Sequence, residues 1–154
     1  MIYFATDHRG FELKEKLKKF VESELGFGVK DFGAFEYNVE DDYPDFISQA
    51  AETVSKNPDQ DKAIILGGSG QGEAIVANRY QGIRAIVYYG GVNDIITLSR
   101  EHNNANVLSL GAAFLDEEEA KKAVRIWLEH PFSHEERHVR RIKKIETEIK
   151  NQKV

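Results

Sequence analysis

The chain of 154 residues contains no cysteine. Disulfide scaffolds, cysteine-ligated zinc or iron–sulfur sites and mechanisms that use a catalytic thiol are therefore excluded. A chain of this length buries roughly 70% of the surface that its unfolded form exposes, so a single domain over residues 1–154 can be stable without disulfide bonds. The absence of cysteine also fits a reducing compartment.

Positive charge and long apolar runs are scarce as well. The 21 basic and 26 acidic residues give a formal net charge of −5, whereas nonspecific nucleic-acid binders are usually basic. No run approaches the roughly 20 apolar residues that cross a bilayer. The apolar start 1–5 is followed at once by Asp7, His8 and Arg9, unlike a signal peptide. We therefore expect a cytoplasmic protein that binds neither nucleic acid nor membrane.

Five short runs of apolar, mostly β-branched residues recur along the chain, with helical patterns between them. Their hydrophobicity is nearly continuous, which is typical of strands buried on both faces of a parallel sheet. The alternation of strand and helix predicts an α/β fold with a five-stranded parallel sheet and helices on both faces. Asp116 is expected to be the N-cap of one helix, 117–129. The predicted strands are 2–5, 29–32, 63–66, 85–88 and 107–110.

The last predicted helix, at about 134–150, differs from the others because it has an apolar and a basic stripe. Such a helix packs back on its own sheet or reaches a partner subunit, and a basic stripe is often only a solvated face. Two guanidiniums one turn apart can also bind a phosphate bidentately. The apolar stripe is Val139, Ile142, Ile145 and Ile149, and the basic one is Arg137, Arg141 and Lys144.

Polar residues gather next to the predicted strands. Asp7 and His8 follow the first strand, and a glycine-rich segment, 67–72, follows the third. Ligands of open parallel sheets bind beyond the carboxyl ends of the strands, so we expect the site there. His102 lies shortly before the fifth strand, and we expect it near the same sheet edge as His8, where histidines can move protons near neutral pH. We expect no metal site, although one His-x-x-x-His spacing occurs, at His134 and His138.

The segment 67–72 contains four glycines in six residues and is followed by Glu73. Its backbone can point successive N–H groups at one anion, although glycine-rich turns also serve tight packing. It matches neither the P-loop nor the dinucleotide fingerprint. A carboxylate beside this loop has two explanations. Glu73 is either a general base next to an oxyanion hole or an acid that favours the helix dipole.

Together these segments resemble the ribose-5-phosphate isomerase B family, which also includes the galactose-6-phosphate isomerase subunits. The resemblance covers nearly the whole chain, and the order and spacing of the motifs make it specific. The matching segments are 7–10 with Leu13 and Lys14, 41–45, 67–73 with Ala77 and Asn78, 82–85, 100–104, and Arg137, His138, Arg140 and Arg141.

The resemblance implies a Rossmann-like α/β/α sandwich that forms a homodimer, paired into a tetramer in some members, with active sites at the dimer interface. It implies isomerisation of a phosphosugar between aldose and ketose through a cis-enediolate, without metal or cofactor. One branch of the family has a cysteine base at the start of the glycine loop, where this chain has Gly67. The other branch has a glutamate after the loop, where this chain has Glu73.

The resemblance also implies a role for each matching residue. Glu73 moves the proton between C2 and C1, His102 opens the sugar ring, Asp7 supports a hydroxyl and Ser69 lies beside the substrate. The enediolate oxygen is held by the backbone amides of Gly68, Gly70, Gln71 and Gly72. The phosphate is held by His8, Arg137, His138 and Arg141, and the pocket is lined by Tyr43 and Asn103.

Two positions depart from the family pattern. Arg9 replaces a small residue, and Ala113 stands where many members carry a phosphate-binding arginine. Our hypothesis is that Arg9 substitutes for that arginine. The leading prediction is a ribose-5-phosphate isomerase. The alternatives are an isomerase of a hexose 6-phosphate, such as allose or galactose 6-phosphate, and a non-catalytic phosphosugar-binding subunit.

Overall fold

The computed structural model describes residues 1–151, and their side chains as far as residue 149. Its sheet has five strands in the order β2-β1-β3-β5-β4, and all neighbouring pairs are parallel. The predicted α/β class, the parallel sheet and the five strand positions are confirmed. The strands are β1 (Ile2–Thr6), β2 (Val29–Asp31), β3 (Lys62–Gly67), β4 (Ala85–Tyr88) and β5 (Val107–Gly111).

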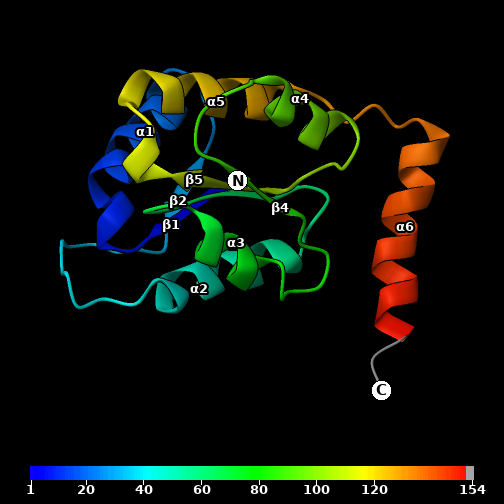
Figure 1. Ribbon diagram of the computed structural model, residues 1–154, viewed down its shortest axis with the longest axis horizontal. Helices are drawn as coiled ribbons and strands as arrows, with labels where there is room; N and C mark the ends of the chain where they lie inside the picture. The colour runs from blue at the N-terminus through cyan, green and yellow to red at the C-terminus, as the bar shows by residue number, and fades with distance from the viewer. Residues whose placement is uncertain (152–154) are drawn as a thin grey trace.

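Helices cover both faces of the sheet and make a three-layer sandwich (Figure 1). One apolar core lies under α1, α4 and α5 and contains Phe4 and Trp127, both fully buried. The other lies under α2 and α3 and contains Ile47 and Val54. The helices are α1 (Phe11–Ser23), α2 (Tyr43–Ser55), α3 (Gln71–Ala77), α4 (Asp94–Glu101) and α5 (Glu117–Glu129).

The strand order places a ligand crevice between β1 and β3. The chain leaves β1 towards β2 on one side and leaves β3 towards β4 and β5 on the other. Such a switch point opens a crevice at the carboxyl ends of the two strands. The hydroxyl of Thr6 donates to the carbonyl of Leu66 at 2.9 Å and ties these two strand ends together.

The loop between β2 and α2, residues 32–42, is held against the end of β1 by a buried lysine. Lys14 has no exposed side-chain surface, and its ammonium donates to Asp31 at 2.7 Å and to the carbonyl of Ala34 at 2.7 Å. Burial alone would raise the pKa of Asp31, but Lys14, Lys18 and the N–H of Gly33 outweigh it and hold that pKa below its usual range. The loop is thereby fixed next to the crevice.

The last helix, α6 (Glu136–Asn151), lies beside the sandwich and belongs to neither of its helical layers (Figure 1). The guanidinium of Arg84 pairs with Glu146 on α6 at 2.8 Å. Three residues of its predicted apolar stripe, Val139, Ile145 and Ile149, are 43%, 46% and 56% exposed. Among residues 1–151, no helix has the length and apolar character needed to cross a bilayer.

Candidate active site

The glycine loop joins β3 to α3 at the crevice. Gly70 has a left-handed backbone with φ of +79°, and its carbonyl accepts a hydrogen bond from the Ser109 hydroxyl at 2.6 Å. Within the described part of the chain, the N–H groups of Gly68, Ser69 and Gly70 donate to no protein acceptor. Three backbone donors in a row therefore remain available to an anion, as the glycine pattern predicts.

The carboxyl group of Glu73 packs directly on the backbone of Gly67. A Cβ atom at position 67 would overlap with this carboxyl group, so a larger residue there would displace the Glu73 carboxyl from its place. Glu73 is 4% exposed, and burial raises its pKa above the usual value. Its own backbone N–H acts in the opposite direction, and the nearby Asp7 raises the pKa further. A buried carboxyl with a raised pKa beside free amide donors is suited to general acid–base work.

A second buried carboxyl, Asp7, follows β1 and caps a short 3₁₀ segment (His8–Gly10). Its Oδ1 accepts from the backbone N–H of Arg9 at 2.9 Å, and its side chain is buried. Burial raises the pKa of Asp7, and Asp41 adds to that, while Arg9 and His8 lower it. Two carboxyls with raised pKa values therefore share one crevice, as in sites that need one group neutral and one ionised.

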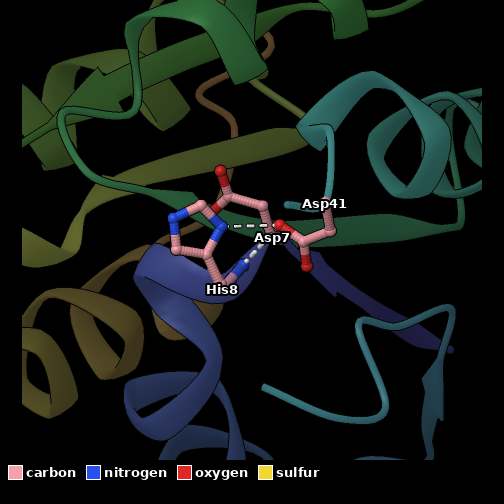
Figure 2. A group of neighbouring side chains, drawn as sticks. All are labelled: Asp7, His8 and Asp41. Atoms are coloured by element: carbon pink, nitrogen blue, oxygen red, sulfur yellow. Dashed lines mark hydrogen bonds and ion pairs between the residues drawn. The ribbon is translucent and has the colours of Figure 1, made fainter. Parts of the chain in front are cut away.

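His8 is held by Asp41, which comes from the β2–α2 loop (Figure 2). The Oδ1 atom of Asp41 lies 2.6 Å from His8 Nδ1 and accepts the backbone N–H of His8 at 3.1 Å. Asp7, His8 and Asp41 offer ligand atoms within 4.8 Å of one another. Since His8 Nδ1 and Asp7 Oδ1 are already engaged in hydrogen bonds, the arrangement fits a bonded aspartate–histidine pair better than a ligand set.

Two side chains lie against glycines of the loop. A Cβ atom added to Gly72 would lie 2.6 Å from the Tyr43 hydroxyl. A Cβ atom added to Gly68 would lie 3.1 Å from the guanidinium carbon of Arg9. The carbonyl of Gly68 accepts from the N–H of Ala113 at 3.0 Å. Arg9 therefore lies over the same glycine that Ala113 contacts, and it forms no ion pair with any described residue.

Comparison with known proteins identifies the family of this chain. The family model described as Ribose/Galactose Isomerase matches residues 2–145. The chain belongs to this family. It is 39% identical to ribose-5-phosphate isomerase B of Mycolicibacterium paratuberculosis over 141 residues, which cover 92% of this chain and 86% of the relative.

Solved structures of this isomerase family have the same fold. The crystal structure of ribose-5-phosphate isomerase B from Mycoplasma genitalium with bound ribulose-5-phosphate superposes with a TM-score of 0.92 at 36% identity, covering 98% of this chain and 97% of that one. A ribose 5-phosphate isomerase from Thermotoga maritima gives a TM-score of 0.85 at 40% identity, covering 94% of this chain and 96% of that one. The predicted Rossmann-like sandwich is confirmed.

Most of the predicted isomerase residues meet at the carboxyl edge of the sheet. Ser69 is exposed on the glycine loop, and its hydroxyl accepts from the N–H of Gln71 at 3.3 Å. The residues that the structure brings to this edge are Asp7, His8, Arg9, Tyr43, Gly68, Ser69, Gly70, Gln71, Gly72 and Glu73.

The other predicted residues lie at the amino edge, between the end of α4 and the start of α6. The rings of His102 and His138 stack with their centroids 4.2 Å apart and their planes 17° apart. His138 is 4% exposed, and its Nε2 has no hydrogen-bond partner among the described residues. Burial lowers the pKa of His138, and His102 and Arg137 lower it further. Asn103, Arg137 and Arg141 are exposed nearby in the chain.

The expectation that His102 lies near the same sheet edge as His8 is wrong within one chain. His102 follows α4, and this crossover helix brings the chain back to the amino ends of the strands. Next to it, the carbonyl of Asn104 accepts from the side chain of Arg84, which precedes β4. Residues that precede a parallel strand and residues that follow one lie at opposite edges of the sheet. His102 precedes β5 and His8 follows β1, so the two lie at opposite edges.

Two residues of this site, Asp41 and Lys14, belong to the family-like segments, but the sequence predicts no role for them. Asp41 holds His8, and Lys14 holds the loop that carries Asp41. An aspartate two residues before Tyr-Pro and a lysine in an amphipathic helix have no local signal for such contacts, because their partners are distant in the chain. The one available hint was Lys14 on a helix position that the apolar pattern places inside.

Proposed function

We propose that this protein interconverts ribose 5-phosphate and ribulose 5-phosphate through a cis-enediolate, with Glu73 as the general base. The observation that carries the proposal is the buried Glu73 carboxyl packed on Gly67, beside the free N–H groups of Gly68, Ser69 and Gly70. The names of the relatives and the ribulose-5-phosphate bound by the Mycoplasma genitalium structure support this substrate.

The chemistry follows from this geometry. Glu73 in its ionised form takes the proton from C2 of the open-chain aldose, and the C–H electrons form the C1–C2 double bond of the enediolate. The charge that develops on the carbonyl oxygen is stabilised by the amides of the glycine loop. The proton of the C2 hydroxyl passes to the oxygen on C1, and Glu73 returns its proton to C1, which leaves the C2 carbonyl of the ketose. A carboxyl pKa raised by burial makes Glu73 a better base than an ordinary surface glutamate and keeps its proton transferable in both directions.

We infer that the working site combines two chains of a homodimer. Ring opening by His102 and phosphate binding by Arg137, His138 and Arg141 require these residues near Glu73. Within one chain the five residues of β5 separate the two edges, a distance of about 13 Å at about 3.3 Å per residue. A second copy that presents its amino edge to this carboxyl edge completes the site. The exposed apolar stripe of α6 gives that copy a surface to pack on.

Complementation tests the shared site. Glu73→Gln and His102→Ala chains, each inactive alone, are co-expressed with different tags and purified together. If each site takes Glu73 from one chain and His102 from the other, random mixing restores about one quarter of the wild-type activity, because half of the dimers have one intact site. The control pairs Glu73→Gln with the double variant Glu73→Gln/His102→Ala, which leaves no intact site. Activity no higher than this control contradicts the shared site.

A parallel assay tests the substrate. Ribose 5-phosphate, allose 6-phosphate and free ribose are offered to the purified protein, and proton exchange at C2 is followed. We expect the highest kcat/KM with ribose 5-phosphate. A preference for allose 6-phosphate supports the hexose-phosphate alternative, and no exchange with any of the three sugars supports a non-catalytic subunit.

A further inference from the structure

Asp41 is the residue whose geometry goes furthest beyond the roles given above. It lies in the loop 32–42, which has no regular secondary structure, and its side chain is 9% exposed. Its Oδ1 faces both the ring Nδ1 and the backbone N–H of His8 (Figure 2). A long loop that buries a carboxylate next to a ligand crevice is a functional rather than a connecting feature.

The two contacts determine how His8 can act. A carboxylate oxygen at 2.6 Å from Nδ1 accepts the Nδ1 proton, which selects the tautomer and fixes the ring orientation. The other ring nitrogen, Nε2, then points away from Asp41 (Figure 2). The ring of Tyr37, from the same loop, meets the His8 ring edge-on at 6.0 Å and supports this orientation. His8 therefore presents one defined nitrogen.

The arrangement has a cost that folding alone does not explain. The Oδ2 atom of Asp41 is buried and has no hydrogen-bond partner among the described residues, and Asp7 lies close enough to be repelled. An unsatisfied buried carboxylate oxygen reduces stability. Natural proteins accept such costs mainly at functional sites.

We propose that Asp41 is a positioning residue that holds His8 so that Nε2 meets the anionic end of the substrate. This rests on the proposed function, in which His8 contacts the sugar phosphate. Lys14 contributes to the same positioning of His8, because its buried contacts with Asp31 and Ala34 hold the start of the loop that carries Asp41. The loop 32–42 thus fixes the orientation of His8, which follows β1.

Steady-state kinetics of Asp41→Ala and Asp41→Asn test this role. We expect Asp41→Ala to raise KM for ribose 5-phosphate about 10-fold or more with kcat changed less than about 3-fold, since a hydrogen bond to a charged group is lost. Asp41→Asn keeps an oxygen that can accept both N–H groups, and we expect it to recover much of this loss. The matched control is Glu40→Gln, which removes an exposed carboxylate one residue away.

A readout independent of turnover separates positioning from scaffolding. The imidazole ¹⁵N spectrum of the wild type, with His8→Gln identifying the signals, is expected to show His8 protonated at Nδ1, and Asp41→Ala is expected to shift it towards the other tautomer. Unchanged His8 signals in Asp41→Ala, or equal losses of kcat/KM for ribose 5-phosphate and free ribose, overturn the proposal. A wild type without isomerase activity refutes the proposed function instead, while the spectrum still reports on the pair.

Discussion

The two edges of the sheet differ in how much of a site each one completes. At the carboxyl edge, Glu73, Asp7 and His8 are buried or half-buried among backbone and side-chain partners that one chain supplies. At the amino edge, Arg137 and Arg141 are exposed on a helix outside both layers, and His138 has an unpartnered nitrogen. Under the proposed function, the fold of one chain supplies the proton-transfer residue and part of the phosphate site, while ring opening and the arginines of α6 come from a second copy.

The largest expected effect is that of Glu73→Gln on turnover. Loss of the general base is expected to lower kcat about a thousandfold, measured as C2 proton exchange, while the amide of similar shape still packs on Gly67. Binding of ribose 5-phosphate, measured by calorimetry, is expected to change little. Activity within about 10-fold of the wild type removes Glu73 as the base.

The same substitution is expected to raise Tm at pH 7. Because burial raises the pKa of Glu73, its ionised form destabilises the folded state at any pH above the folded-state pKa. Glutamine removes this charge, so the variant melts at a higher temperature. The difference disappears below the pKa of the unfolded chain, where the carboxyl is protonated in both states. Equal Tm values at pH 7 would mean that the buried carboxyl imposes no cost.

Substitutions on either side of the sheet compare how firmly each edge is held. Lys14→Met leaves Asp31 with Lys18 as its one described ion-pair partner, and we expect the free energy of unfolding to fall by about 3 kcal/mol in urea titrations. Glu146→Gln removes the Arg84 pair that links α6 to the sandwich, and it is expected to cost about 1 kcal/mol or less. Similar losses for both variants would contradict the difference between the edges.

Arg9→Ala is expected to have a smaller effect, confined to the phosphate. Its guanidinium lies over Gly68 without an ion pair in the described part of the chain, so we expect KM for ribose 5-phosphate to rise about 10-fold. Kinetics with free ribose should be unchanged. Small and equal effects on both sugars would mean that Arg9 does not replace the arginine missing at Ala113.

The mildest test is the acid side of the pH profile. A base must be ionised to act, so kcat/KM is expected to fall as the pH drops through the pKa of Glu73. Since burial raises that pKa, the midpoint should lie above the ordinary glutamate value of 4.5. A profile that stays flat down to pH 4 argues against Glu73.

Local patterns in the sequence predicted what local physics decides. The five strands were visible as continuous apolar runs, and Asp116 caps α5 as expected, with its side chain accepting the N–H of Glu119. The glycine loop and the family resemblance together indicate Glu73 as a candidate general base. The edge on which His102 lies follows from its place before a predicted parallel strand, so the sequence was sufficient to assign it to the amino edge. The Asp41–His8 contact joins residues 33 positions apart and leaves no pattern within a short window.

The packing of Glu73 on Gly67 also limits how this protein can change by mutation. A cysteine at position 67, as in the other branch of the family, would need the space that the glutamate carboxyl fills. A side chain at position 67 therefore moves the glutamate carboxyl away from the glycine loop, and a variant that keeps Gly67 but loses Glu73 lacks the base proposed here. Under the proposed function, an exchange of one base for the other is thus a change at two positions rather than at one.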